Sequence, residues 1–441
     1  MEVIADLHIH SKYARATSKD ISFENLEKYA RIKGLSLLGT GDFQHPIWNK
    51  EIKEKLKEDE NGILRTKTGF PFIWQTEISF MYSQSGKGRA VHLVILAPNS
   101  SAADKITAYL KEKGRIDYDG RPIFGISCKQ FIKEVKEIND KIEIIPAHCM
   151  TSWFGVYGSE RGFDSLSEAF GEQAEHIYAV ESGMSANPEM LWRFKEKFNV
   201  VSFSDSHSFW PWRLGREATI FELNELSYNN LIKAIRTGVG LKGTIETPPE
   251  YGKYHWDGHR NCNFSCSPEE TKKLNSICPV CKSKMTIGVD YRVEEIAKEK
   301  YGFKPVNSKL FYELIPLHEL IAFHISTSML GGKRVWEIYN NLIKHFDNEI
   351  NILLNIKREE LEKAIPEHKE LIDLVLLNRE GKIEVKPGFD GVYGKIAYQG
   401  KESKFKDDNK PAKNESKNEN ENEDNNKSEI ERKKEKQKKL F

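Results

Sequence analysis

The sequence predicts an α/β protein whose main domain is a distorted (β/α) barrel, followed by a small four-cysteine zinc module, a mainly helical C-terminal region and a disordered tail. Two observations predict the barrel. Short apolar, β-branched segments alternate with segments of helical period over residues 1–245. Residues of types that can bind a metal ion (His, Asp and Glu, called ligand-type residues below) follow most of the apolar segments. Strand-then-helix order implies a parallel sheet, and so many units favour a closed or nearly closed barrel with its chemistry at the C-terminal ends of the strands.

The expected strands of the barrel are short runs of Val, Ile, Leu and Phe. They lie at 3–7, 35–42, 70–79, 90–97, 142–148, 177–182 and 199–207. Apolar residues recur with helical period at 23–33, 128–138 and 229–238, which predicts helices between the strands. Because 441 residues are too many for one ordinary core, further domains are expected.

The sequence after the barrel divides into segments of different composition. Residues 246–290 are rich in Pro, Gly, His and Cys, which predicts a small metal-held module. Helical period returns over 291–398. It is clearest at 293–303, 311–325 and 334–346. Residues 399–436 contain almost no apolar side chains, so they cannot offset their chain entropy and are predicted to form a disordered tether.

The bulk composition indicates a cytoplasmic protein. The formal net charge is +1, so total charge does not by itself indicate a nucleic-acid partner. No apolar run approaches the roughly 20 residues that cross a bilayer, and the first residues lack the pattern of a secretion signal. Cys128 and Cys149 stand alone in apolar surroundings, as expected for small buried thiols in a reducing compartment.

Two histidines follow the first apolar run, at positions 8 and 10. Residues i and i+2 of a strand point to the same face, so the two imidazoles project together and are suited to bind a metal ion. Taken alone, this pair is equally compatible with unrelated surface or core histidines. Asp205 and His207 repeat the same spacing after the last barrel strand.

Ligand-type residues lie at the ends or edges of six expected strands, and together they predict a polynuclear metal centre. Imidazole and carboxylate ligands suit Zn²⁺, Mn²⁺ or Mg²⁺, and two such ions about 4 Å apart can activate water and hold a phosphodiester. The predicted ligands are His8, His10, Glu77 and Asp205 for one ion, with Asp42, His92, His148 and His207 completing the cluster. Glu181 and Ser182 are predicted to orient a ligand or the substrate, the alternative for Glu181 being a helix cap.

This ligand set resembles the polymerase and histidinol phosphatase (PHP) family of metal-dependent phosphoesterases, whose fold is a distorted barrel of alternating strands and helices. The resemblance rests on the His-x-His opening, the glutamate, the single histidines and the closing Asp-x-His. The chain departs from the family at Thr40-Gly41-Asp42, where Asp42 replaces a histidine, and at Arg15 to Lys19, where an acid is often found. Two ions are therefore expected in preference to three.

Longer motifs resemble a narrower group within that family, the endonuclease Q family. They are 15–19, 146–153, 162–165, 181–188, 204–208, 214–218 and 387–394, together with the four clustered cysteines. The resemblance implies a DNA-repair endonuclease that cuts on the 5′ side of a deaminated base (uracil, hypoxanthine or xanthine) or an abasic site and leaves a 3′-hydroxyl. Recognition would require flipping the damaged base out of the stack.

Basic and aromatic residues are predicted to contact such DNA, because cations neutralise phosphates and aromatic rings support unstacked bases. The candidates near the strand ends are Arg15, Lys19, Trp153, Arg213 and Arg216, and those in the glycine-rich turn of the C-terminal region 291–398 are Lys386, Tyr393 and Lys395. Ordinary packing or a solvated charge is the alternative for each of them.

The cysteine cluster has the spacing of one tetrahedral zinc site. Four thiolates would leave no open coordination position, so the zinc would be structural. The predicted ligands are Cys262, Cys266, Cys278 and Cys281. His255 and His259 precede the cluster and could replace one ligand, although surface histidines are the preferred interpretation.

The last five residues, 437–441, resemble the box by which archaeal repair enzymes bind the sliding clamp. Gln437, Leu440 and Phe441 carry the resemblance, although the usual paired aromatics are missing. A disordered tether would let the catalytic body search DNA while attached to the clamp. Two alternatives to the endonuclease remain: a phosphatase for a small phosphate monoester, and a non-catalytic, clamp-associated DNA-binding protein.

Overall fold

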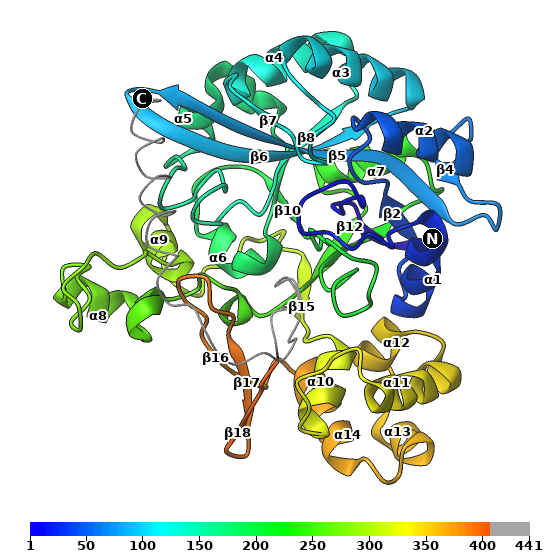
Figure 1. Cartoon of the computed structure of the whole chain (residues 1–441), viewed down its shortest axis with the longest axis vertical. Helices are drawn as coiled ribbons and strands as arrows, with labels where there is room; N and C mark the ends of the chain where they lie inside the picture. Colours follow the sequence, from blue (N-terminus) through cyan, green and yellow to red (C-terminus); the bar gives the residue numbers. More distant parts are fainter. Residues whose placement is uncertain (406–441) are drawn as a thin grey trace, which may run out of the picture. The chain divides into compact units, whose positions relative to one another are not determined.

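The structure is a computed structural model that describes residues 1–405, so the predicted clamp-binding residues and most of the predicted tether lie outside the described residues. A mixed sheet forms its centre (Figure 1). Its hydrogen-bonded path runs β15-β12-β11-β1-β2-β5-β4-β3, with β6 and β7 pairing with β5 and β8 pairing with β6. No helix among the described residues is long and apolar enough to span a membrane.

The strands of this sheet are short except for one long hairpin. They are β1 (Glu2–Asp6), β2 (Leu37–Gly39), β3 (Lys57–Glu58), β4 (Leu64–Arg65), β5 (Pro71–Gln84), β6 (Lys87–Ala97), β7 (Ile123–Phe124), β8 (Glu143–Pro146), β11 (Ala218–Glu222), β12 (Leu241–Glu246) and β15 (Leu310–Glu313). A separate parallel pair is formed by β9 (Ala179–Glu181) and β10 (Asn199–Val201).

Backbone hydrogen bonds outside the regular strands join the two sheets into a ring. On one side, Cys149 N–H donates to the carbonyl of Glu181, which links the end of β8 to β9 at 2.8 Å. On the other side, His10 N–H donates to the carbonyl of Ser206 at 2.9 Å, which links the end of β1 to the segment after β10. The expectation of a nearly closed barrel therefore agrees with the backbone connections β1-β2-β5-β6-β8-β9-β10-β1.

The expectation of a parallel sheet is wrong for the part of this ring that contains β6. β5 pairs with β6 and β6 pairs with β8 in antiparallel register, whereas β1–β2, β2–β5 and β9–β10 are parallel. The reason is local: only Ser85 and Gly86 separate β5 from β6, so the chain turns directly back without a crossover helix. Both turn residues have positive φ, as this hairpin requires.

Helices cover the outside of the barrel. They are α1 (Phe23–Lys33), α2 (Pro46–Lys55), α3 (Ser100–Lys113), α4 (Cys128–Ile138), α5 (Leu166–Phe170), α6 (Pro188–Trp192) and α7 (Tyr228–Thr237). The predicted helices at 23–33 and 128–138 are confirmed at both ends. For α1 the boundaries follow from its caps, because Ser22 accepts a hydrogen bond from Asn25 N–H and Gly34 adopts a left-handed conformation after the last turn.

The small module after the barrel contains β13 (Asp257–His259), β14 (Phe264–Cys266) and α8 (Pro268–Lys273), and α9 (Val289–Ile296) follows it. The predicted helix at 293–303 is largely wrong, because α9 ends at Ile296 and residues 297–309 are irregular. Gly302, with φ of 81°, and Pro305 both oppose a continuous helix in this stretch.

The C-terminal region combines a helical cluster with a small sheet, which Figure 1 shows in yellow to orange. Its elements are α10 (Leu317–His324), α11 (Lys333–Phe346), α12 (Glu349–Leu354), α13 (Arg358–Ala364), α14 (Lys369–Arg379), β16 (Glu384–Lys386), β17 (Lys395–Tyr398) and β18 (Lys401–Glu402). The predicted helix at 311–325 is split, because β15 occupies its first part and α10 begins only after Pro316. β18 lies inside the stretch predicted as a tether, so regular structure continues past residue 399.

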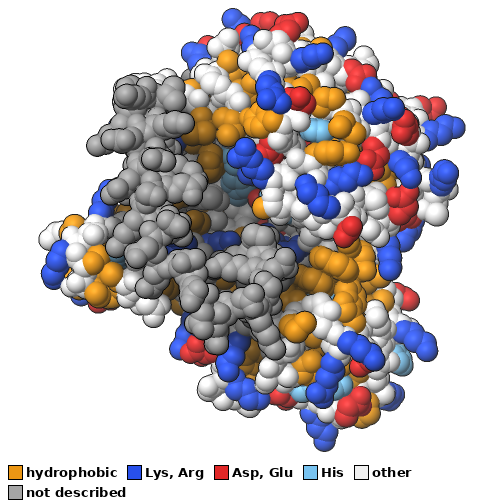
Figure 2. Space-filling view, in the orientation of Figure 1, with side chains coloured by type: hydrophobic (Ala, Val, Ile, Leu, Met, Phe, Trp, Pro, Cys, Tyr) orange, Lys and Arg blue, Asp and Glu red, His pale blue; other side chains and the backbone are white. Residues whose placement is uncertain are grey.

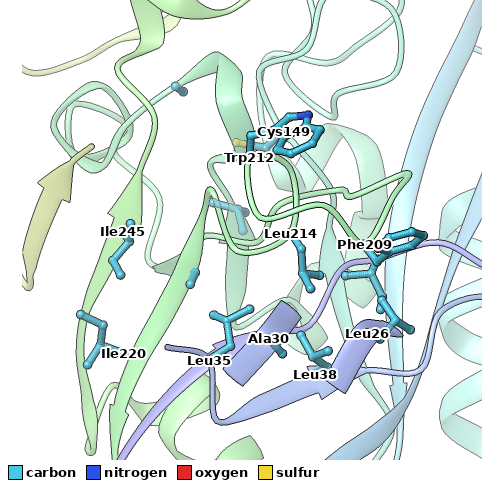
Figure 3. Close-up of a cluster of buried hydrophobic side chains, with 14 of the residues drawn as sticks. Leu26, Ala30, Leu35, Leu38, Cys149, Phe209, Trp212, Leu214, Ile220 and Ile245 are labelled. Atoms are coloured by element: carbon cyan, nitrogen blue, oxygen red, sulfur yellow. The ribbon is translucent and has the colours of Figure 1, made fainter. Parts of the chain in front are cut away.

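The loop between β10 and β11 packs against α1 and not into solvent. Figure 3 shows Phe209 and Leu214 of this loop beside Leu26 and Ala30 of α1, all of them buried. Trp212 stacks on Trp210 with ring centroids 5.2 Å apart. Burying these rings stabilises the fold by roughly 2 kcal/mol for each large side chain, so the loop is fixed where it leaves the barrel.

Candidate metal centre

Four side chains from three parts of the barrel converge at the C-terminal end of β1. His8 and His10 follow β1, Glu77 lies in β5, and Asp205 follows β10; one ligand atom of each lies within 4.8 Å of the others. His10 Nε2 is 3.1 Å from Glu77 Oε2 and 3.0 Å from Asp205 Oδ1. His8 Nε2 is 3.5 Å from Glu77 Oε2 and 3.6 Å from Asp205 Oδ1. These are the four residues predicted to share one ion.

A second group shares Glu77 with the first. His92 Nδ1 lies 2.8 Å and His148 Nε2 lies 3.1 Å from Glu77 Oε1, the carboxylate oxygen that the first group does not use. Glu77 is fully buried, and its two oxygens lie between two sets of imidazoles. Neither Glu77 nor His92 is at a strand end, since both lie within the long β5–β6 hairpin, where His92 is opposite Ser79.

The buried imidazole nitrogens fit a divalent metal ion. Nδ1 of His8 is engaged by Glu181 at 2.9 Å, and Nδ1 of His10 is engaged by Asp42 at 2.9 Å. Each contact leaves Nε2 directed at the carboxylates, and Nε2 of the fully buried His8 has no hydrogen-bond partner. Metal-binding histidines characteristically hold one nitrogen against a carboxylate and offer the other to the ion.

Three residues of the centre have a left-handed backbone, which non-glycine residues rarely adopt. The φ angles are 37° for Asp42, 31° for His148 and 48° for Asp205. Each conformation costs of order 1–3 kcal/mol and persists only where the surrounding structure imposes it. Strain at three members of one cluster indicates that the fold is built around the positions of these side chains.

Charges within the centre prepare the ligands for a cation. Burial opposes ionisation of Glu77, but Arg121 and the imidazoles of His8 and His10, whose own pKa values are raised, outweigh it, so the pKa of Glu77 lies well below its usual value. For Asp205 the same balance lowers the pKa as well, mainly through His207 and His8. Burial lowers the pKa of His92 to about 3, so this imidazole is neutral at physiological pH and its lone pair is free to bind a metal.

The remaining predicted members surround these two groups. Asp42 lies in neither group, because its oxygens accept hydrogen bonds from His10 Nδ1 and from Ser11 N–H at 2.7 Å. The ring of His207 lies against the ring of His10, with centroids 4.5 Å apart and planes tilted by 51°, and its Nδ1 is 2.9 Å from the carbonyl oxygen of Asp205. Glu181 orients His8 and also accepts from His148 N–H at 2.6 Å, which matches its predicted orienting role.

Ser182 points away from the centre, so its predicted role beside the substrate does not match its contacts. Its hydroxyl donates to Glu246 at 2.8 Å within a buried polar cluster behind the barrel. Ser202 Oγ lies in the same cluster, 2.8 Å from Glu217 Oε2 and 3.0 Å from Glu246 Oε2. These residues support the fold beneath the metal centre.

Sequence reasoning missed Arg121, which lies in a loop without an apolar or ligand-type pattern, so no local signal distinguishes it. Arg121 Nη1 donates to Glu77 Oε2 at 3.0 Å. The ring of Phe154, next to Trp153 in the sequence, stacks on His92 with centroids 4.4 Å apart. A glycine that permits close packing precedes Arg121, which is the one feature that could have drawn attention to it.

The cysteine cluster differs from the predicted ligand set at one position. The four residues whose ligand atoms lie within 4.8 Å of one another are His259, Cys262, Cys278 and Cys281. Nδ1 of His259 is 3.2 Å from Sγ of Cys262 and 3.2 Å from Sγ of Cys281. Cys266 instead contacts the hydroxyl of the buried Thr271 at 3.2 Å. His259 faces the cluster because β13 ends there and the chain turns directly into Cys262, whereas Cys266 lies at the far end of β14, opposite Asp257.

The residues predicted to bind DNA fall into two classes. Arg213 is half-buried, with Nη1 3.4 Å from Glu319 Oε1, and Arg216 donates to the carbonyl of Ser204 at 3.2 Å, so both have structural contacts. The others are more accessible, among them Arg15, which pairs with Asp119 at 3.0 Å, and Trp153, which is 40% exposed. Of the rest, Lys19 Nζ contacts the carbonyl of Lys12, Lys386 and Lys395 pair with Glu402, and Lys253 lies over the ring of Tyr393.

Comparison with family models and curated proteins identifies relatives of two kinds. Residues 316–382 match the MJ0043 C-terminal domain, which places α10–α14 in a recognised domain family. The uncharacterized protein MJ0043 of Methanocaldococcus jannaschii is 34% identical over 262 residues, which are 57% of this chain and 32% of that protein. The chain therefore spans about a third of the length of this curated relative.

Two solved structures match almost the whole chain. The lesion-specific endonuclease PfuEndoQ from Pyrococcus furiosus is 30% identical, with a TM-score of 0.80, over 90% of this chain and 95% of that one. A structure of endonuclease Q with a 27-mer duplex that carries an abasic lesion at the active site matches with 30% identity and a TM-score of 0.80, over 90% of this chain and 96% of that one. Because 30% identity extends over 90% of this chain and at least 95% of each of those chains, the chain belongs to the endonuclease Q family.

Proposed function

We propose that this chain is a metal-dependent DNA-repair endonuclease that cuts on the 5′ side of a deaminated base or an abasic site and leaves a 3′-hydroxyl. The observation that carries the proposal is the pair of imidazole groups sharing Glu77 at the barrel mouth. Membership of the endonuclease Q family supports a hydrolase of the nuclease class, and the abasic duplex bound by one family member supports DNA as the substrate.

The chain offers two ion positions. His8, His10, Glu77 and Asp205 would hold one ion, and Glu77, His92 and His148 would hold the other. Such a pair supplies an activated water and stabilises charge on the attacked phosphate. Glu181 and Asp42 fix the ring orientation of His8 and His10, so that Nε2 of each histidine faces the cluster. These two groups support the proposal of two ions.

The finer features of the substrate remain part of the proposal. Uracil, hypoxanthine and xanthine pair weakly or wrongly, which lowers the cost of flipping them out of the duplex for inspection. Exposed residues around the barrel mouth, such as Arg15, Lys19 and Trp153, are suited to contact phosphates and an unstacked base. Lys386, Tyr393 and Lys395 of the C-terminal region are proposed to extend the contact along the DNA.

The proposal also includes a structural zinc ion and a protein partner. The group of His259 with three cysteines would hold one structural Zn²⁺, because four N and S ligands leave no open position for chemistry. Binding of the sliding clamp through Gln437, Leu440 and Phe441 stays a prediction, since these residues lie outside the described part of the chain.

A cleavage assay tests this proposal. End-labelled duplexes that differ only in one deoxyuridine, one deoxyinosine, one abasic site or no lesion are incubated with Mg²⁺ or Mn²⁺. We expect a single cut 5′ of each lesion and an intact control duplex. The variant His8→Ala should lose the cut, whereas His345→Ala, which changes an exposed histidine of α11, should retain it. Hydrolysis of a small phosphate ester with no cut at any lesion would favour the phosphatase.

A further inference from the structure

Among the described residues, Arg121 is the one arginine whose side chain contacts Glu77, the residue that the two candidate ligand groups share. It lies in the loop between α3 and β7, and its Nη1 is 3.0 Å from Glu77 Oε2. Glu77 is completely buried, while the Arg121 side chain is 29% exposed. The Arg121 side chain therefore connects the buried ligand Glu77 with solvent.

The surrounding loop fixes Arg121 in this place. Asp119 Oδ1 accepts a hydrogen bond from Arg121 N–H at 3.1 Å, and Gly120 N–H donates to the carbonyl of Tyr13 at 3.1 Å. A side chain at Gly120 would overlap the carboxylate of Asp42, which orients His10. The loop thus packs its backbone directly on the ligand framework, so Arg121 is held in advance of substrate binding.

Glu77 does not use up the hydrogen-bonding capacity of Arg121. A guanidinium has five N–H donors, and among the described residues the only acceptor that its side chain contacts is Glu77 Oε2. That oxygen already faces His8 at 3.5 Å and His10 at 3.1 Å, and Oε1 faces His92 and His148. Most of the donors on Arg121 are therefore available to a further anion next to the cluster.

We propose that Arg121 binds a non-bridging oxygen of the phosphate that is cut. Arginine suits this task because its planar fork matches phosphate oxygens and keeps its charge at every physiological pH. Burial opposes the charge, but Glu77 and Asp205 outweigh it, so the pKa of Arg121 is raised further. This assignment rests on the proposed function, because it identifies Arg121 as the residue of the candidate metal centre that would contact the phosphodiester.

In the hydrolysis, the oxygen of a water molecule forms a bond to phosphorus while the bond from phosphorus to the 3′-oxygen breaks. The attacking water gives up one proton and the departing 3′-oxygen takes up one, so that it becomes the 3′-hydroxyl. The lesion-bearing fragment keeps a 5′-phosphate. Negative charge on the non-bridging oxygens is met by the guanidinium, which needs no reorganisation because the loop already holds it in place.

The test compares Arg121→Gln and Arg121→Lys with the wild-type chain and with Arg115→Gln. Arg115 lies in the same loop, but its side chain is 73% exposed and pairs with Asp117. Three quantities are measured: the single-turnover cleavage rate of an abasic duplex, the metal bound per chain, and the inhibition constant of inorganic phosphate in the hydrolysis of bis(4-nitrophenyl) phosphate. Thermal unfolding of each variant verifies that it is folded.

We expect Arg121→Gln to cleave about 100-fold more slowly, the effect of removing one preorganised donor from an anionic site. Phosphate should inhibit it about tenfold more weakly, with an unchanged metal content. Arg121→Lys should recover only part of both effects, because lysine keeps the charge without the fork. Arg115→Gln should behave like wild type.

Either of two outcomes would overturn the inference. One is a loss of bound metal that parallels the loss of cleavage, which would make Arg121 only a support for Glu77. The other is unchanged inhibition by phosphate. If the wild-type chain hydrolyses the small ester but cuts no lesion, and Arg121→Gln still weakens phosphate inhibition, the proposed nuclease function fails while the assignment of Arg121 to a phosphate oxygen stands.

Discussion

Individual carboxylates determine how the metal centre works, and Asp42 is the clearest example. Its oxygens bind His10 Nδ1 and Ser11 N–H, and it belongs to neither ligand group. We expect Asp42→Asn to reduce metal affinity or cleavage about 10- to 100-fold, because the orientation of His10 would lose a charged partner. Metal retained after dialysis and the cleavage rate measure this effect. Asp104→Asn, at an exposed pair with Lys53, is the matched control. Full metal content and full activity in Asp42→Asn would contradict the orienting role.

A second residue-scale prediction concerns the buried pair of Glu217 and Glu246. Burial raises the pKa of both carboxyl groups. The hydrogen bonds agree with this direction. Ser202 Oγ lies within hydrogen-bond distance of one carboxyl oxygen of Glu217 and one of Glu246, but it has a single proton to donate. The other of these two contacts therefore requires a proton on the carboxyl group. In an unfolded chain these groups titrate near 4.5, so above that pH folding takes up a proton.

The sign of the pH dependence follows. As pH rises above 4.5, the free energy of unfolding falls, by up to about 1.4 kcal/mol per pH unit for each proton taken up, until the folded pKa is passed. Glu217→Gln places a neutral group in the same space. We expect it to lose less stability than wild type between about pH 5.5 and about pH 7.5. Urea unfolding at both pH values measures this, and equal losses in the two proteins would exclude a protonated pair.

At the scale of elements, the cysteine-rich module shows that sequence spacing alone does not determine which residues lie close enough together to hold one ion. Cys266 and Cys281 are equally plausible ligands by sequence, yet β14 directs Cys266 to Thr271 while Cys281 lies beside His259. We expect Cys266→Ser to retain one zinc ion per chain and Cys281→Ser to lose it. Zinc release followed with a chromogenic chelator measures both. Loss of zinc from Cys266→Ser with retention in His259→Ala would restore the four-cysteine set.

The same scale explains what the sequence could predict. His8 and His10, like Asp205 and His207, are paired by a strand rule that acts over two residues, so their grouping could be predicted locally. The sharing of Glu77 by two groups depends on how β5 and β6 pair, which a tight turn and not a residue pattern determines. Arg121 and His259 acquire their roles only through packing between segments far apart in the sequence. Local patterns therefore predict the candidate ligands on one strand better than they predict the residues that packing brings beside them from elsewhere in the sequence.

At the scale of the whole described chain, one buried ion pair joins the barrel to the helical C-terminal cluster. Lys33, at the end of α1, lies 2.7 Å from Glu349 Oε1 and donates to the carbonyl of Pro211 at 2.8 Å. Glu349 also accepts from Leu317 N–H at 3.0 Å and from the Tyr339 hydroxyl at 2.9 Å. These contacts connect α1, the loop after β10 and three helices of the C-terminal cluster. We infer that the barrel and the C-terminal cluster unfold together.

This inference leads to a prediction about Glu349→Gln. Removing one charge leaves Lys33, whose side chain is only 3% exposed, without an ionic partner, which should cost about 3–5 kcal/mol of unfolding free energy. Lys33→Met combined with Glu349→Gln should cost less than the sum of the single changes, because neither charge is then left unpaired.

Tryptophan fluorescence during urea unfolding measures these changes in stability, since Trp210, Trp212 and Trp336 cluster near this junction. Lys55→Met, at an exposed pair with Glu24, should leave stability almost unchanged, because solvent screens such a pair. If Glu349→Gln is equally harmless, or if the C-terminal cluster melts in a separate earlier transition, the ion pair does not couple the two parts. A single cooperative transition shifted to lower urea would instead show that the barrel mouth, through Pro211 and its loop, depends on the C-terminal cluster for its stability.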